Sequence, residues 1–105
     1  MKNLLAAAAL MTITLVSPAS ASQESEVCPT VANMAVSLME ARQAGVPLLD
    51  LLTALEAFTG MAGKLANSMA LEAYEQPLYS TESYQQESVT EFGNTMLLSC
   101  LKGNL

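Results

Sequence analysis

The chain of 105 residues contains no histidine and no tryptophan, and only two cysteines and four basic residues. Without histidine, a Ser-His-Asp or Cys-His catalytic arrangement is excluded, and the commonest metal-ligating side chain is missing. The sequence also lacks a glycine-rich phosphate-binding loop and the alternating acidic pattern of a calcium loop. We therefore expect a protein that is not an enzyme and that uses no cofactor and no metal.

Positive charge is scarce, because four Lys and Arg residues stand against ten Asp and Glu residues, a formal net charge of −6. Nucleic acids and anionic lipid headgroups repel such a surface, so neither is expected as a partner. A protein partner with a basic surface is compatible with this charge, although a solvated acidic surface is the simpler interpretation. The oligomeric state stays open.

Residues 1–21 have the features of a secretory signal peptide. Lys2 precedes an uncharged apolar run of about 13 residues, which is shorter than the roughly 20 that span a bilayer. Ala19-Ser20-Ala21 then fits the cleavage rule, with an uncleaved membrane anchor as the alternative. We expect cleavage after Ala21, a periplasmic or secreted location, and one domain over residues 22–105 with no membrane association.

The two cysteines, Cys28 and Cys100, stand near the two ends of the expected domain. Export to an oxidising compartment favours one intramolecular disulfide, with two free thiols or an intermolecular bridge as the alternatives. The bond would close a loop of about 73 residues, which the chain-entropy model values at roughly 4 kcal/mol. Because so short a domain has a small core, we expect this bond to decide whether it folds stably.

Four runs of apolar residues at helical spacing predict four helices. Gly45 with Pro47, Gly60, and Gln76-Pro77 mark the breaks between them. The expected helices cover residues 29–44, 47–59, 62–75 and 81–102. Short connections make successive helices antiparallel, so an even number of helices brings the two cysteines to the same end. The expected fold is therefore all-α: a small antiparallel four-helix bundle closed by one disulfide.

Two residues have a specific role in forming or packing the last expected helix. Ser80 is expected to cap its start. Gly93 lies in its interior and costs about 1 kcal/mol relative to alanine, which indicates a kink or a close contact with another helix.

Three tyrosines surround the break at Pro77, namely Tyr74, Tyr79 and Tyr84. Amphipathic aromatic side chains of this kind are enriched at binding interfaces. The alternative is that the rings cover helix ends and cap the core. We treat Tyr74, Pro77, Tyr79 and Tyr84 as a candidate protein-binding corner.

Glutamates occur as two pairs that each share a helix face, Glu72 with Glu75 and Glu87 with Glu91. Paired carboxylates can serve acid–base chemistry or bind a cation, but a solvated acidic face is the simpler interpretation. The expected domain also has several methionines, which act more often as core filler than as an adaptable binding surface. They are Met34, Met39, Met61, Met69 and Met96.

Short motifs are distributed over nearly all of the expected domain. They are Cys28, Arg42-Gln43-Ala44-Gly45, Ala73-Tyr74-Glu75-Gln76-Pro77, Tyr79-Ser80-Thr81, Phe92 and Cys100. Together they resemble a set of short exported proteins from proteobacteria and their phages. That set has no assigned function, so the resemblance implies only an exported helical protein with two cysteines. Leu78 stands where members often carry a basic residue, so no charged site is carried over to the corner.

The favoured function is a small exported, periplasmic protein that binds another protein without catalysis. The alternative is a protein like the small periplasmic acid-stress chaperones, which this chain resembles in size, compartment and cysteine count only. In the expected domain the only basic residues are Arg42, Lys64 and Lys102. Net charge would therefore change sign on acidification, which could loosen the bundle and expose apolar surface.

Overall fold

The computed structural model describes residues 27–105, and the structural statements below concern that part of the chain. The first helix, α1, is described over residues 27–43. It is followed by α2 (Leu48–Leu55), α3 (Gly60–Glu75) and α4 (Glu82–Leu101). These residues contain no strand, so the predicted all-α fold with four helices is confirmed. The expected signal peptide, residues 1–21, lies outside the described residues.

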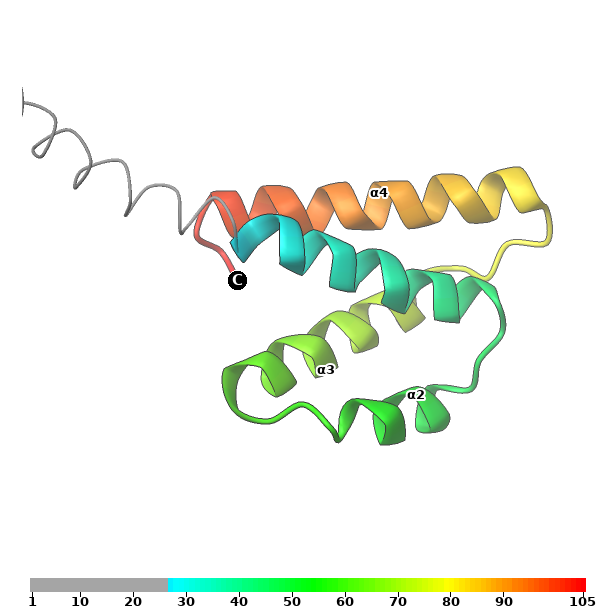
Figure 1. Cartoon of the computed structure of the whole chain (residues 1–105). Helices are drawn as coiled ribbons and strands as arrows, with labels where there is room; N and C mark the ends of the chain where they lie inside the picture. The colour runs from blue at the N-terminus through cyan, green and yellow to red at the C-terminus, as the bar shows by residue number, and fades with distance from the viewer. Residues whose placement is uncertain (1–26) are drawn as a thin grey trace, which may run out of the picture.

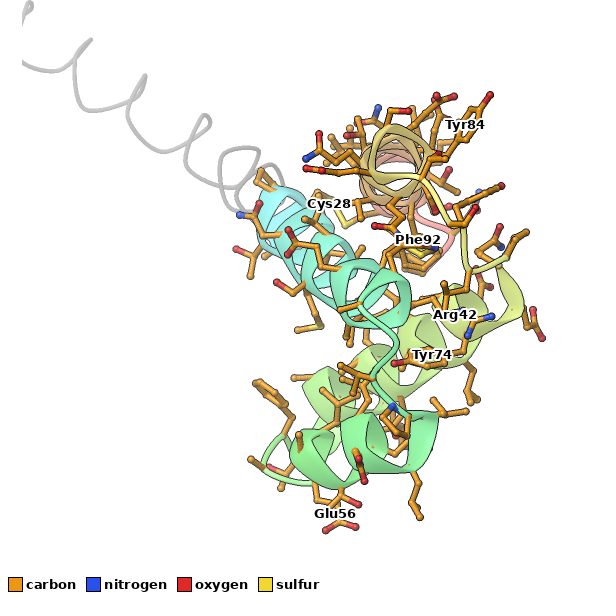
Figure 2. All side chains as sticks on the ribbon, turned by 90° about the vertical axis from the view of Figure 1, so that its right-hand side faces the viewer. Cys28, Arg42, Glu56, Tyr74, Tyr84 and Phe92 are labelled. Carbon is orange, nitrogen blue, oxygen red and sulfur yellow. A yellow bond between two sulfur atoms is a disulfide. The ribbon has the colours of Figure 1, made fainter. Side chains whose placement is uncertain are left out.

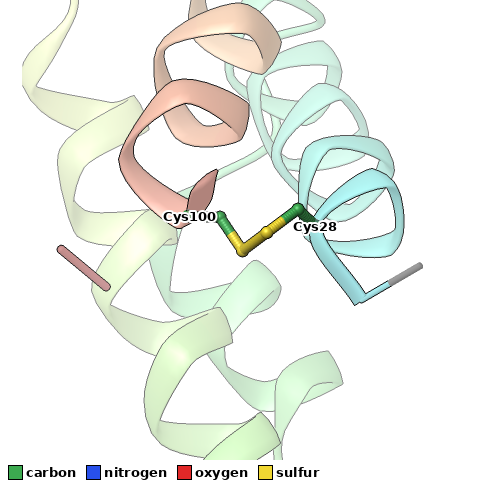
Figure 3. The surroundings of a disulfide bond; sticks show 2 residues. All are labelled: Cys28 and Cys100. Carbon is green, nitrogen blue, oxygen red and sulfur yellow. A yellow bond between two sulfur atoms is a disulfide. The ribbon is translucent and has the colours of Figure 1, made fainter. Parts of the chain in front are cut away.

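Successive helices run in alternating directions (Figure 1). α1 and α4 pack side by side, α3 lies against this pair, and α2 lies on the side of α3 away from α4 (Figures 1 and 2). A disulfide joins Cys28 near the start of α1 to Cys100 near the end of α4, with 5.5 Å between the two Cα atoms (Figure 3). The predicted antiparallel bundle and its intramolecular disulfide are therefore confirmed.

The core lies mainly between α1, α3 and α4. Its buried side chains are Val31, Ala35, Leu38 and Met39 of α1, Leu55 of α2, Ala66, Met69, Ala70 and Ala73 of α3, and Phe92 and Met96 of α4. The alanines of α3 let the neighbouring helices approach closely, and Met39 and Met69 fill the remaining space. The interpretation of methionine as core filler is confirmed for these two and for Met96, whereas Met61 is 79 % exposed.

Two glycines allow close approaches that no side chain would permit. A Cβ atom on Gly93 would lie 2.7 Å from Cγ2 of Val36 on α1. A Cβ atom on Gly63 would lie 2.5 Å from the carbonyl oxygen of Phe58, in the connection between α2 and α3. Both distances are shorter than real carbon contacts, so a side chain at either position would push two elements apart. The close helix contact expected at Gly93 is confirmed.

The break between α2 and α3 differs from the expected one. α2 ends at Leu55 rather than near Thr59, because the chain turns at residues 56–57 and then extends. α3 begins at Gly60, whose φ of +66° suits glycine and changes the direction of the chain. Gly60 therefore starts the third helix instead of only ending the second.

The start of α4 also differs, because Ser80 does not cap it. The cap position is Thr81, and its side chain makes no capping hydrogen bond. Instead, Nε2 of Gln85 donates to the carbonyl oxygen of Tyr79 at 2.6 Å and fixes the entry to the helix. Within residues 27–105, none of the helices combines the length and the apolar character that a membrane span requires.

Candidate functional site

The corner between α3 and α4 is held by a buried glutamine at the end of α1. Gln43 is only 6 % exposed, and it is the one polar residue among residues 27–105 that is buried. Its Nε2 donates to the carbonyl oxygen of Pro77 at 2.8 Å and lies 3.4 Å from Oγ of Ser88. Its Oε1 accepts the backbone N–H of Tyr79 at 3.0 Å. One amide thus pairs with a donor and an acceptor of the corner backbone and fixes it against α1.

The residue before Gln43 holds the same corner from another side. Nε of Arg42 donates to the carbonyl oxygen of Gln76 at 3.1 Å. The Arg42 guanidinium also lies 5.3 Å from the centroid of the Tyr74 ring, a cation–π distance (Figure 2). The Tyr74 hydroxyl donates to the carbonyl oxygen of Val46 at 2.6 Å. These contacts tie the end of α3 to the connection between α1 and α2.

Burial raises the pKa of the Tyr74 phenol above its ordinary value of 10.0. The positive charge of Arg42 lowers this pKa and the negative charge of Asp50 raises it, each less strongly than burial. Tyr74 therefore stays protonated at neutral pH and keeps its bond to Val46. Its hydroxyl and its contact with Arg42 are both used inside the domain, which makes its role structural.

The other members of the predicted corner remain accessible. Tyr79 is 37 % exposed, Tyr84 is 59 % exposed, and Pro77 is exposed as well. The two rings lie with their centroids 6.0 Å apart and their planes tilted by 42°. The structure therefore separates the four predicted residues into a structural Tyr74 and an exposed set of Pro77, Tyr79 and Tyr84. Their binding of a protein stays a prediction.

A groove with a volume of about 460 Å³ runs between α3 and α4, and we call it the α3–α4 groove. Tyr79 and Tyr84 border it, and its lining along α4 extends from Tyr84 to Met96. At 1.5 Å per residue this is a length of about 18 Å. The buried side chains of Met39, Phe92 and Met96 form its floor. The groove thus combines exposed aromatic rings with an apolar base.

Three exposed carboxylates also border the α3–α4 groove, Glu72 from α3 and Glu87 and Glu91 from α4. No lysine or arginine of residues 27–105 lines it. The sequence predicted a pair of Glu72 with Glu75, but only Glu72 reaches the groove, where it joins the pair on α4. No group of three or more His, Cys, Asp or Glu side chains in residues 27–105 is placed to hold a metal ion.

A second hollow borders the first half of α4, between that helix and the end of α1. Glu40, Glu82 and Gln86 are among its lining residues, and Gln43 also reaches it. It contains no aromatic side chain, so it offers less contact area to a partner than the α3–α4 groove does.

The sequence predicts no separate role for Gln43, because a glutamine in the last turn of a helix is ordinarily exposed. The available signal was its place in the Arg42-Gln43-Ala44-Gly45 motif. The structure gives that motif a physical role, since Arg42 and Gln43 bind the backbone of the corner that follows α3.

Comparisons of the chain with family models, with curated proteins and with solved structures give no significant match. The resemblance to short exported proteins therefore stays a prediction, and function is argued from the site.

Proposed function

We propose that the protein is an exported, non-catalytic binding module whose contact surface is the α3–α4 groove. The observation that carries this proposal is the combination of two exposed tyrosines with an apolar floor in one groove. Tyrosine side chains with a partly apolar surrounding are frequent energetic centres of protein interfaces. The groove therefore has the side chains that a protein-binding surface uses.

The backbone of this surface is ordered before any partner binds. Gln43 donates to the carbonyl oxygen of Pro77 and accepts the backbone N–H of Tyr79, and Gln85 donates to the carbonyl oxygen of Tyr79. These hydrogen bonds fix the segment that presents one of the two rings. A surface that is already ordered loses less conformational entropy on binding, so a larger share of the contact energy appears as affinity. This rigidity supports a binding role for the corner.

The size of the groove favours a short segment of a partner rather than a broad flat surface. An extended peptide rises about 3.3 Å per residue, so about five residues would occupy a length of about 18 Å. Export is supported by the disulfide, because such bonds persist in oxidising compartments, and by the signal-peptide features of residues 1–21.

The test is site-specific photo-crosslinking in cells that export the protein. A photoreactive residue at Thr95, which lines the groove, is expected to form a discrete adduct. The same residue at Met61, which is exposed on α3 but outside the groove, serves as the control. Tyr84→Ala should reduce the adduct at Thr95, because it removes one exposed ring.

Adducts of equal yield at Thr95 and Met61 would contradict the proposal. The acid-stress chaperone alternative makes a different prediction, namely protection of a client protein from aggregation at about pH 2–3. Protection there, without position-specific crosslinking, would favour that alternative.

A further inference from the structure

The charge of the α3–α4 groove is of one sign. Glu72, Glu87 and Glu91 border it, and all three are exposed. Among the residues that the structure describes, no basic one lines the groove. A groove lined by one sign of charge attracts ligands of the opposite sign and repels others. The complementary occupant is therefore cationic, and acidic segments or nucleic acids are disfavoured.

The carboxylates are spread along the groove rather than gathered around one point. Glu87 and Glu91 lie one helical turn apart on α4, and Glu72 belongs to α3. In the described part of the chain, residues 27–105, no such side chains form a cage for a metal ion. The pattern suits a ligand that carries several positive charges at intervals along its length.

The floor and one end of the groove suit the stems of long basic side chains. Lysine and arginine lay their methylene groups on apolar surface while the charged head reaches outward. Phe92 and Met96 provide that surface, and the carboxylates stand at its border. The exposed ring of Tyr84, on the turn before Glu87, adds a face for a cation–π contact.

Polar uncharged groups in the same groove distinguish a peptide from a simple polyamine. The side-chain amide of Gln76 and the hydroxyl of Thr95 line the groove, and both can donate a hydrogen bond. A peptide backbone offers carbonyl oxygens to such donors, whereas a polyamine has only cationic and apolar groups. The lining therefore favours a peptide.

We infer that the occupant of the α3–α4 groove is an extended segment of a basic protein that presents lysine or arginine side chains at intervals. This inference rests on the proposed function, since it names the partner class of the same site. It commits to a protein segment, and a free polyamine becomes an outcome of the test.

The experiment is selection of peptides of about ten residues from a random library on the exported, disulfide-bonded protein, the length being about twice what the groove accommodates. Wild type is expected to enrich lysine and arginine relative to the input library. A synthetic peptide from the enriched pool should bind at least about tenfold more weakly to the double variant Glu87→Gln with Glu91→Gln, and more weakly at high salt. The matched control is Glu56→Gln with Glu75→Gln, which changes net charge equally but lies outside the groove and should retain affinity.

The outcomes separate this inference from the proposed function. Enrichment of peptides without basic residues, or equal affinity for both double variants, would overturn the inference of a basic ligand. The proposed function as a binding module would still stand. Displacement of the peptide by spermidine at equal concentration would overturn the inference of a protein segment and indicate that the ligand is a polyamine. Failure to enrich any peptide above a support without protein would overturn both the inference and the proposed function.

Discussion

The two halves of α4 differ sharply in how they are packed. Residues 92–101 bury Phe92, Gly93 and Met96 and include the disulfide to α1. Residues 82–91 contain no buried residue and border both the α3–α4 groove and the second hollow. The buried side chains of α4 are therefore concentrated in its second half, whereas the α3–α4 groove extends over both halves.

Part of the difference arises because α1 does not reach the start of α4. The two helices meet at Cys28 with Cys100, at Val36 with Gly93, and at Gln43 with Ser88. The helical part of α1 ends at residue 43, so residues 82–87 extend beyond it. Because the buried side chains are concentrated in the second half of α4, changes in the two halves should affect stability differently.

The largest effect is expected at the disulfide in the buried half. Cys100→Ser removes a cross-link that closes nearly the whole domain, and such bonds contribute about 2–5 kcal/mol. Each kcal/mol shifts the melting temperature of so short a domain by about 4–8 °C. We expect a decrease of more than about 10 °C, or an unfolded chain at 37 °C, measured by thermal circular dichroism. An unchanged melting temperature would show that the cross-link does not support the bundle.

A smaller effect is expected at Gln43, which attaches the start of the exposed half of α4 to α1. Gln43→Leu would leave the carbonyl of Pro77 and the N–H of Tyr79 without their partner, at a cost of about 2–3 kcal/mol. Hydrogen exchange should accelerate more in residues 79–91 than in residues 92–101, because only the first segment loses its attachment. Uniform acceleration along α4 would contradict this local role, and Gln86→Leu, on the exposed side, is the control.

The next effect tests the close contact of the buried half with α1. Gly93→Leu places a side chain where even a Cβ atom would lie 2.7 Å from Val36, so we expect a loss of about 1–2 kcal/mol. Asn94→Leu, one position along and exposed, should change stability by less than about 0.5 kcal/mol. Chemical denaturation gives the free energy of unfolding of both variants. Equal losses of stability would show that the contact between Gly93 and Val36 has no special role.

Tyr74 provides a test outside α4, at the contact between α3 and the α1–α2 connection. Because burial raises its pKa, the folded state holds the phenolic proton more tightly than the unfolded state does. Its contribution to stability is complete below about pH 10 and is lost as the pH rises through the folded-state pKa. Tyr74→Phe removes the bond to Val46, at about 0.5–1.5 kcal/mol, and should abolish this alkaline loss in urea unfolding. If the Tyr74→Phe variant still lost stability at alkaline pH, that loss would belong to another titrating group.

The smallest effect on stability is expected at the groove carboxylates. Glu87→Gln with Glu91→Gln changes exposed side chains that bury no surface, so the free energy of unfolding should change by less than about 0.5 kcal/mol. The same variant is the one expected to lose affinity for a basic peptide. A large loss of stability would show that the exposed half of α4 also supports the fold.

Much of the architecture could be predicted from local sequence signals. The helical spacing of Val31, Ala35 and Leu38 predicted a buried face, and the breaks at Gly45 and Pro77 predicted where helices end. The two cysteines, combined with an even number of helices, predicted that the start of α1 lies beside the end of α4. These features were readable because each depends on spacing along the chain or on the backbone preference of a single residue.

The candidate site was predicted only in part. The corner tyrosines were identified from composition, but the different roles of Tyr74 and of Tyr79 with Tyr84 were not. Gln43 was missed, because its partners lie more than thirty positions away in the sequence. A polar side chain becomes a buried anchor only when another segment brings backbone groups to it.

The sequence by itself therefore determined the helices, their alternation, the disulfide and the acidic charge. Tertiary structure decided how α1 is placed along α4, that Glu72 joins Glu87 and Glu91 at one groove, and that Gln43 anchors the corner. The physical reason is range. Helix formation and chain breaks follow from neighbouring residues, whereas a groove and a buried hydrogen bond require the relative placement of helices that are distant in the chain.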